Sequence, residues 1–229
     1  MTSPTFPTQS GPLTLAGPAG ALEAAIDLPD ADVPALPLVA VVCHPLPTEG
    51  GTMHNKVVTM VARALRELGA TTLRFNFRGV GKSQGTFDNG VGELSDAASA
   101  LDWVQSFHPE AQTTWIAGFS FGAWIGMQLL MRRPEIRGFI SIAAMANRYD
   151  FTFLAPCPSS GLFVHGSEDR VAPAREVMPV IEKVKVQKGV IIEHQMVEGA
   201  NHFFDGKVDE LTQTVDTYLD KRLGPAKAA

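Results

Sequence analysis

The chain alternates between short apolar runs that suit buried strands and longer stretches with the spacing of amphipathic helices. One such unit starts at the valine-rich run Leu38–Cys43, continues through a helical face that ends before Gly69, and returns to a strand at Thr71–Phe77. Strand–helix–strand units build mostly parallel sheets with helices on both faces. Because this rhythm continues to Leu223 without a linker or an internal repeat, we predict a single α/β domain.

The same patterns place the other elements. Further strands are predicted on either side of the turn Gly17–Gly20 within Leu13–Asp27, and at Thr113–Gly118, Ile136–Ala144, Ser159–Gly166 and Gly189–Val197. Further helices are predicted around Leu94–Val104, at Ala123–Arg132, at Pro173–Val184 despite the internal Pro179, and at Val208–Leu223. We assign residues 1–12 to a disordered N-terminal segment, residues 13–223 to the domain, and residues 224–229 to a loose tail.

Composition and charge restrict the partners. Of the 229 residues, 45% are hydrophobic, which suffices for a large core, and the net charge of −5 without a basic cluster argues against nucleic acid and anionic membranes. The N-terminus lacks the pattern of a secretory signal, and no apolar run approaches the ~18 residues of a membrane span. Cys43 and Cys157 form no C-x-x-C pair, so we expect buried thiols in a reducing compartment and a cytoplasmic protein. Oligomeric state is not predicted.

Three polar residues lie in the loops that follow three of the predicted strands. Ser120 follows one internal strand, Asp169 follows another, and His202 follows the last strand of the chain. In open parallel sheets, ligands bind at the carboxyl ends of the strands. We therefore expect these three side chains to meet at one edge of the sheet.

A serine, a histidine and an aspartate in one place can perform nucleophilic catalysis. A serine hydroxyl is a poor nucleophile until a base takes its proton, and histidine exchanges protons near neutral pH. A carboxylate behind the imidazole fixes its tautomer and stabilises its charged form. The segment Gly118–Gly122 reads G-F-S-F-G and matches the G-x-S-x-G turn that holds a nucleophilic serine between a strand and a helix.

Each of these residues also has an ordinary structural interpretation. Ser120 could be a turn residue, Asp169 could cap the helix that follows it, and His202 could be a surface histidine. Glu168 and Asp205 are alternative carboxylates, and we expect Asp205 to cap the last helix. Because the three residues share one sheet edge in the order Ser, Asp, His, we favour Ser120, Asp169 and His202 as a catalytic set.

The remaining histidines and the glycine-rich loop do not indicate a cofactor or a metal. His44 and His54 follow the strand Leu38–Cys43 and could line a pocket, but we assign neither as a base. The histidines lack a metal-ligand spacing, and Gly79–Ser83 lacks the spacing of a phosphate-binding loop. The histidines expected to be structural are His108, His165 and His194.

Taken together, these motifs resemble the α/β-hydrolase fold family, and more narrowly the small lid-free bacterial serine hydrolases, esterases related to dienelactone hydrolases. The resemblance spans about Leu13–Leu223 and rests on the segments "HPLPTEGGTMHNKVV", "LRFNFRGVGKSQGTFDNGVGELSDA", "AGFSFGAW", "HGSEDRVAP" and "GANHFF". It implies that Ser120 is the nucleophile, His202 the base and Asp169 the acid. True dienelactone hydrolases have a cysteine in place of Ser120, so the chain departs from them at the nucleophile.

The resemblance also implies an oxyanion hole and an open pocket. One backbone N–H would come from Phe121, and the second from Leu46, which follows a His-Pro pair. The connection Ala143–Pro158 is too short for a cap domain, so we expect none. The residues expected in the pocket walls are Phe119, Met145 and Met53, with Tyr149, Phe151 and Phe153 as further candidates.

Three functions fit this pattern. The first is hydrolysis of short-chain carboxylic esters through an acyl-Ser120 intermediate, with a small-molecule ester as the partner. The second is thioester cleavage or acyl transfer with the same three residues, which relative rates on thioesters and oxygen esters would distinguish. The third is a catalytically silent binding module, which a fluorophosphonate probe that fails to label Ser120 would favour.

Overall fold

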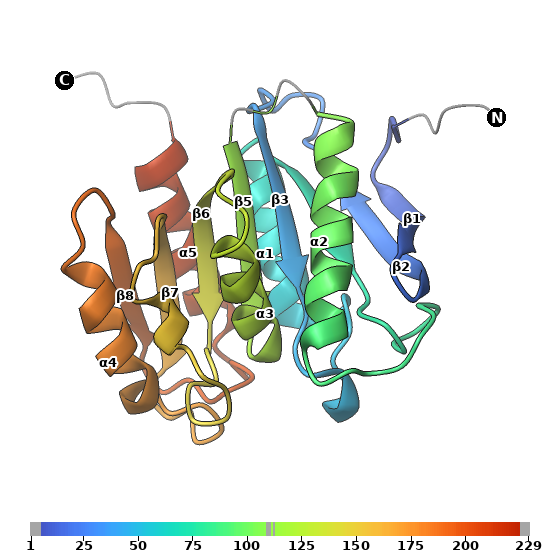
Figure 1. The fold of residues 1–229 in the computed structure, drawn as a ribbon. Helices are drawn as coiled ribbons and strands as arrows, with labels where there is room; N and C mark the ends of the chain where they lie inside the picture. Colours follow the sequence, from blue (N-terminus) through green and yellow to red (C-terminus); the bar gives the residue numbers. More distant parts are fainter. Residues whose placement is uncertain (1–5, 109–110, 112, 225–229) are drawn as a thin grey trace.

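The computed structural model describes residues 6–108, 111 and 113–224. Its strands form one sheet in the order β1-β2-β4-β3-β5-β6-β7-β8 (Figure 1). The pairs β1–β2 and β2–β4 are antiparallel, whereas every pair from β4 to β8 is parallel. The strands are β1 (Gly11–Gly17), β2 (Gly20–Asp27), β3 (Leu38–Cys43), β4 (Thr71–Phe75), β5 (Thr113–Phe119), β6 (Ile136–Ile142), β7 (Ser160–Gly166) and β8 (Ile192–Val197).

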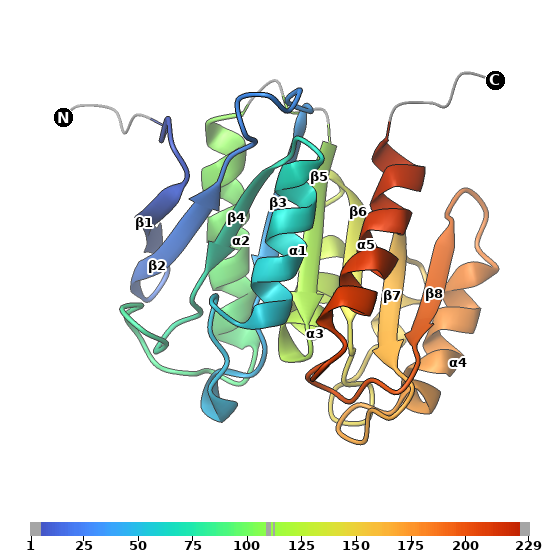
Figure 2. The same cartoon turned by 180° about the vertical axis from the view of Figure 1, so that it is seen from behind.

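Helices cover both faces of the sheet. In Figure 1, α2, α3 and α4 lie on the near face, and Figure 2 shows α1 and α5 on the opposite face. The helices are α1 (Lys56–Glu67), α2 (Val91–Ser106), α3 (Phe121–Leu130), α4 (Ala174–Lys185) and α5 (Val208–Leu223), with short 3-10 turns at η1 (Pro47–Glu49) and η2 (Thr152–Leu154). This is the predicted single-domain α/β architecture.

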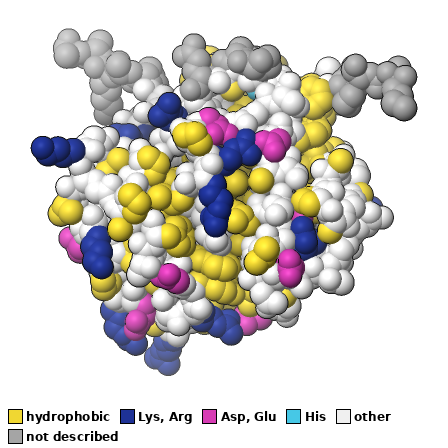
Figure 3. Space-filling model, viewed as in Figure 1, with side chains coloured by type: hydrophobic (Ala, Val, Ile, Leu, Met, Phe, Trp, Pro, Cys, Tyr) yellow, Lys and Arg dark blue, Asp and Glu magenta, His cyan; other side chains and the backbone are white. Residues whose placement is uncertain are grey.

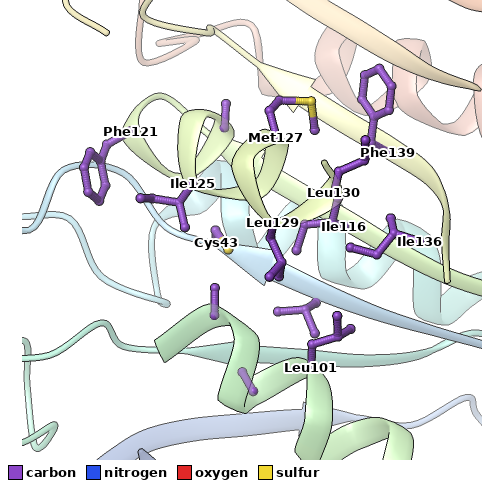
Figure 4. Close-up of a cluster of buried hydrophobic side chains, with 14 of the residues drawn as sticks. Cys43, Leu101, Ile116, Phe121, Ile125, Met127, Leu129, Leu130, Ile136 and Phe139 are labelled. Carbon is purple, nitrogen blue, oxygen red and sulfur yellow. The ribbon is translucent and has the colours of Figure 1, made fainter. Parts of the chain in front are cut away.

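The core consists of two apolar clusters, one on each face of the sheet. Every residue of β3 is buried, and Val39 and Val41 belong to the cluster beneath α2 and α3. Figure 4 shows this cluster, in which Leu101 of α2 and Leu129 of α3 approach Ile116 of β5. Because helices cover both faces of β3 and β5, the carboxyl ends of these strands form a fixed base for the loops that follow.

Three predicted strands were too long at one end by two residues or more, and each has a local reason. β4 ends at Phe75 instead of Phe77, because the backbone N–H of Phe77 donates to the ring of His44 and leaves the sheet ladder. β6 ends before Ala143, whose φ of 49° lies in the left-handed region. β8 begins at Ile192 instead of Gly189, whose φ of 85° belongs to a turn.

The first strand starts before the predicted boundary at Leu13. β1 already begins at Gly11, and the ring of Phe6 lies 5.9 Å from that of Trp103 on α2. The predictions for residues 1–5 and 225–229 fall outside the described residues. At the other end, the Gly224 N–H donates to the carbonyl of Asp220 at the close of α5.

In the part of the chain that the structure describes, no cap domain stands over the sheet edge at which the parallel strands end. The connection Ala143–Pro158 contains only the short turn η2. Within the described residues, no helix is both long and apolar enough to cross a membrane. On the face in Figure 3, basic and acidic side chains are interspersed, and both occur at the lower edge, where these strands end.

Candidate active site

The turn between β5 and α3 holds Ser120 in a strained conformation. Its φ of 58° and ψ of −116° are unusual for a residue with a side chain, and its N–H donates to the carbonyl of Ile142. A Cβ at Gly118 would lie 2.2 Å from the carbonyl oxygen of Gly122, and a Cβ at Gly122 would lie 2.3 Å from that of Cys43. Only glycine fits at both positions, so the G-x-S-x-G pattern reflects the close approach of β5, α3 and the end of β3.

Ser120, His202 and Asp169 form a continuous chain of hydrogen bonds. The Ser120 Oγ lies 3.0 Å from Nε2 of His202, and Nδ1 of His202 lies 2.8 Å from Oδ2 of Asp169. The three residues are 3%, 4% and 6% exposed, so the chain is shielded from bulk solvent. The structure thus brings together the three residues that the sequence predicted to share one edge.

Asp169 is held in place by the loop after β7. Its Oδ1 accepts hydrogen bonds from the backbone N–H groups of Val171 and Ala172, at 2.9 and 2.8 Å. Asp169 therefore orders its own loop and does not cap α4, which begins only at Ala174. One carboxylate oxygen is thus fixed by the backbone while the other faces His202.

Neither alternative carboxylate approaches His202 in this way. Glu168 is exposed, and Asp205 pairs with Lys56 and accepts a hydrogen bond from Asn201. The prediction that Asp205 caps the last helix was wrong, because α5 starts at Val208 and Lys207 occupies its N-cap position. The Asp205 carboxylate joins α1 to the loop that carries His202.

The loop after β3 is fixed by a buried histidine. The Phe77 N–H donates to Nε2 of His44 at 3.0 Å, so Nδ1 carries the ring proton and donates to the Pro45 carbonyl at 2.7 Å. Burial lowers the pKa of His44 to about 4, so the ring is neutral at pH 7. Because the Pro45–Leu46 peptide is trans, the Leu46 N–H points away from this carbonyl and from His44.

A small pocket lies between this loop and the serine. Its volume is about 60 Å³, and Leu46 and Ser120 both line it. Phe121 is the first residue of α3, and the first N–H groups of a helix have no intrahelical acceptor. The other residues that line the small pocket are Pro45, Glu49, Gly50, Gly51, Asn55, His202 and Phe203.

The residues expected in the pocket walls have different positions. The Met145 Sδ lies 3.0 Å from the Ser120 Oγ, so this side chain touches the predicted nucleophile. Met53 is 2% exposed and donates its N–H to Asn76, and it does not line the pocket. Phe119 is 1% exposed and lies behind the His202 ring, at 5.3 Å between centroids. None of Met145, Met53 and Phe119 is among the residues that line the small pocket, so their expected role in substrate binding stays a prediction.

The aromatic residues of the Ala143–Pro158 connection are also divided. Tyr149 is half-buried and lines a second pocket beside the first one. Phe151 is buried in the core, and Phe153 packs against that core. Of these three side chains, only Tyr149 borders a pocket near the serine.

Other polar groups lie away from this site. A hollow of about 530 Å³ between β8 and α5 is lined by residues such as Glu193 and Lys221 and by none of the three hydrogen-bonded residues. His54 is exposed, whereas His165 is buried. Within the described residues, no group of three or more histidine, cysteine or acidic side chains is arranged to hold a metal ion.

Comparisons with known proteins agree with this fold. The family model for the α/β hydrolase fold matches residues 40–161. An uncharacterized protein of Rickettsia prowazekii is 48% identical over 185 residues, which cover 79% of this chain and 78% of that protein. The chain therefore belongs to the α/β-hydrolase fold family.

Two solved structures are similar over nearly the whole chain. A protein of unknown function from Agrobacterium tumefaciens, provisionally assigned to the α/β hydrolases, is 57% identical with a TM-score of 0.87, covering 93% of this chain and 96% of that one. XC6422 from Xanthomonas campestris, described as an α/β serine hydrolase without a lid, is 41% identical with a TM-score of 0.87, covering 99% and 100%. These similarities support a hydrolase that lacks a cap domain.

Proposed function

We propose that this protein hydrolyses short-chain carboxylic esters through an acyl-Ser120 intermediate. The observation that carries the proposal is the buried hydrogen-bond chain from Ser120 through His202 to Asp169, which opens onto a small pocket. This arrangement has the geometry of a nucleophile, a base and an orienting acid. The same geometry would serve a thioester, so the test below includes one.

In the first half-reaction, Ser120 attacks the ester carbonyl while Nε2 of His202 takes the hydroxyl proton. Asp169 accepts the Nδ1–H bond, which keeps Nε2 free to act as the base, and stabilises the imidazolium that forms. The proton on Nε2 then passes to the departing alcohol oxygen as the carbon–oxygen bond breaks. The products are the free alcohol and an ester between the acyl group and Ser120.

In the second half-reaction, water replaces the alcohol. His202 takes a proton from the water as its oxygen attacks the acyl carbonyl, and then returns the proton to the Ser120 oxygen. The acid is released and the hydroxyl of Ser120 is restored.

Two backbone N–H groups are assigned to the oxyanion that forms in each half-reaction. Phe121 presents an N–H at the start of α3, where the helix dipole also favours negative charge. Leu46 presents the second from the loop after β3. His44 has a positioning role here, because its bond to the Pro45 carbonyl sets the orientation of the Leu46 N–H.

The size of the pocket supports small acyl groups. A buried methylene contributes about 0.8 kcal/mol only when it leaves water. A pocket of about 60 Å³ without a cap domain above it can enclose only a short chain. We therefore expect kcat/KM to be highest for acyl groups of two to six carbons and to show no activation at an oil–water interface.

A series of p-nitrophenyl esters from two to sixteen carbons tests the proposal, with Ser120→Ala as the control. The variant should lose about 10⁶-fold in kcat, as when the serine of a comparable triad is removed, while keeping its fold. A maximum at twelve carbons or more, or more than a tenth of the activity left in Ser120→Ala, would contradict the proposal. A thioester of matched acyl length distinguishes an esterase from a thioesterase.

A further inference from the structure

A second pocket adjoins the small pocket at Ser120. It has a volume of about 260 Å³, just below the ~300 Å³ at which ligand pockets usually begin. Leu46 lines both pockets, so they share the wall formed by the loop after β3. The other residues that line the second pocket are Thr48, Phe87, Asn89, Arg148 and Tyr149.

The second pocket is attached to the residues that surround the serine. The ring of Phe121, the residue after Ser120, lies 5.9 Å from Phe87 and 5.7 Å from Tyr149. The Tyr149 N–H donates to the carbonyl of Met145, whose sulfur touches the Ser120 Oγ. Because Leu46 lines both pockets, a substrate whose carbonyl lies at Ser120 can extend along Leu46 into the second pocket.

An ion pair connects the two pockets. Glu49 lines the small pocket, Arg148 lines the second one, and their side chains are 3.0 Å apart. The side chains are 55% and 48% exposed, and ion pairs at this exposure contribute about 0 to 1 kcal/mol. Arg148 has five N–H donors, so it can bind a second carboxylate or exchange Glu49 for one at little cost.

Building on the proposed function, we infer that the preferred esters carry a carboxylate at the far end of the acyl chain, and that Arg148 in the second pocket binds it. The walls around Arg148 suit such a chain, because Phe87 and Tyr149 contact its methylenes while Thr48 and Asn89 offer polar groups at the rim. Glu49 then opposes the same substrates, since its negative charge lies beside the path of the chain. Arg148 and Glu49 therefore act as specificity-determining residues of opposite sign.

The test compares two esters with the same leaving group and chain. One is p-nitrophenyl hydrogen adipate, which has a free carboxylate, and the other is its neutral methyl ester. The measured quantity is the ratio of kcat/KM for the acid to kcat/KM for the methyl ester. Arg148→Met should lower this ratio about tenfold, the effect of one charge-assisted hydrogen bond, and Arg148→Lys should restore part of it. Glu49→Gln should raise the ratio about threefold.

Arg175→Met is the matched control, because Arg175 is an exposed arginine paired with Glu176 and lines neither pocket. It should leave the ratio unchanged. Opposite shifts in the Arg148 and Glu49 variants support the inference, and raising the salt concentration should reduce both shifts. A ratio that stays the same in Arg148→Met, or that moves in the same direction in both variants, would overturn it.

Equilibrium binding separates this inference from the proposed function. Monomethyl and dimethyl adipate are titrated into Ser120→Ala, with and without Arg148→Met. Tighter binding of the monomethyl ester that is lost with Arg148→Met supports the carboxylate site even if the wild-type protein hydrolyses no ester. Equal binding of the two esters overturns the site even if ester hydrolysis depends on Ser120.

Discussion

The two loops that border the pocket at Ser120 reach their shapes by different routes. The turn from β5 to α3 depends on two glycines of one short motif, because a Cβ at Gly118 would meet the backbone of Gly122 and a Cβ at Gly122 would meet the backbone of Cys43. The loop after β3 is shaped from a distance, because His44 joins the Pro45 carbonyl to the backbone N–H of Phe77. The serine half is thus marked by a local sequence pattern, whereas the other half depends on a contact between residues 33 positions apart.

This difference predicts which substitutions damage each half. In the serine half, any added side chain at the two glycines meets backbone atoms within 2.5 Å. In the other half, the backbone of Leu46 has ordinary dihedral angles, with φ of −53° and ψ of 120°, and tolerates substitution. That half requires only that the Leu46 N–H has the correct orientation.

Among substitutions that leave Ser120 in place, the largest effect is expected at the carboxylate that orients His202. Asp169→Asn should lower kcat about 10³- to 10⁴-fold, because the amide favours the wrong tautomer of the histidine. Steady-state kinetics on p-nitrophenyl butyrate measure the loss. Asp205→Asn is the matched control and should cost little activity, since Asp205 is exposed and pairs with Lys56. The reverse ranking would remove Asp169 from its role.

A smaller effect is expected from removing the N–H of Leu46. Proline accepts a φ of −53°, so Leu46→Pro should fold while losing the donor, with a loss of about 10²- to 10³-fold in kcat. Leu46→Ala keeps the N–H and should retain most of the activity. A folded Leu46→Pro protein with normal activity would place the second oxyanion donor elsewhere.

Two substitutions of His44 test its hydrogen bonds to the Pro45 carbonyl and to the Phe77 N–H. An asparagine amide ends near the position of Nδ1 and can still donate to Pro45, whereas a glutamine amide ends near Nε2 and can accept only from Phe77. His44→Gln should lower kcat about 10- to 100-fold, a fraction of the value of a full oxyanion donor, and His44→Asn should lower it less. Equal activities in two folded variants would show that the bond to the Pro45 carbonyl has no positioning role.

The effect furthest from the reaction itself concerns stability in acid. Burial lowers the pKa of His44 and of His165 to about 4, below the ~6.5 of an exposed histidine. The unfolded chain therefore binds more protons between about pH 6.5 and 4, so the free energy of unfolding falls as pH falls through this window, by about 3 kcal/mol for each histidine. Urea denaturation at pH 7 and pH 4.5 should show a smaller difference for His44→Gln than for the wild type. An identical difference would contradict the assignment for His44.

The serine half was predictable because its signal is local. The pattern Gly118–Gly122 between a strand and a helix placed Ser120, and the order of the strands placed Asp169 and His202 at the same edge. The buried position of Phe119 could also have been predicted from the sequence, although we expected this side chain in the pocket wall. Side chains alternate along β5, and Phe119 shares the face of Ala117, which is covered by α1 and α5.

The other half was not predictable, because its contacts join distant segments. Met53 is buried and its N–H donates to the side chain of Asn76, just after β4, and nothing near Met53 in the sequence indicates this contact. His44 offered one signal, a histidine directly after a fully buried strand, but its partner Phe77 was assigned to a strand. The ion pair between Glu49 and Arg148 joins loops 99 positions apart.

The proposed mechanism depends most on Ser120 acting as a nucleophile activated by His202 and Asp169. The most direct measurement is intact-protein mass spectrometry after treatment with a fluorophosphonate, followed by mapping of the modified peptide. We predict one added phosphonyl group per chain on Ser120, and labelling that is slowed strongly in Asp169→Asn and absent in Ser120→Ala. A folded wild-type protein that stays unlabelled, or that carries the group on another residue, would contradict the account.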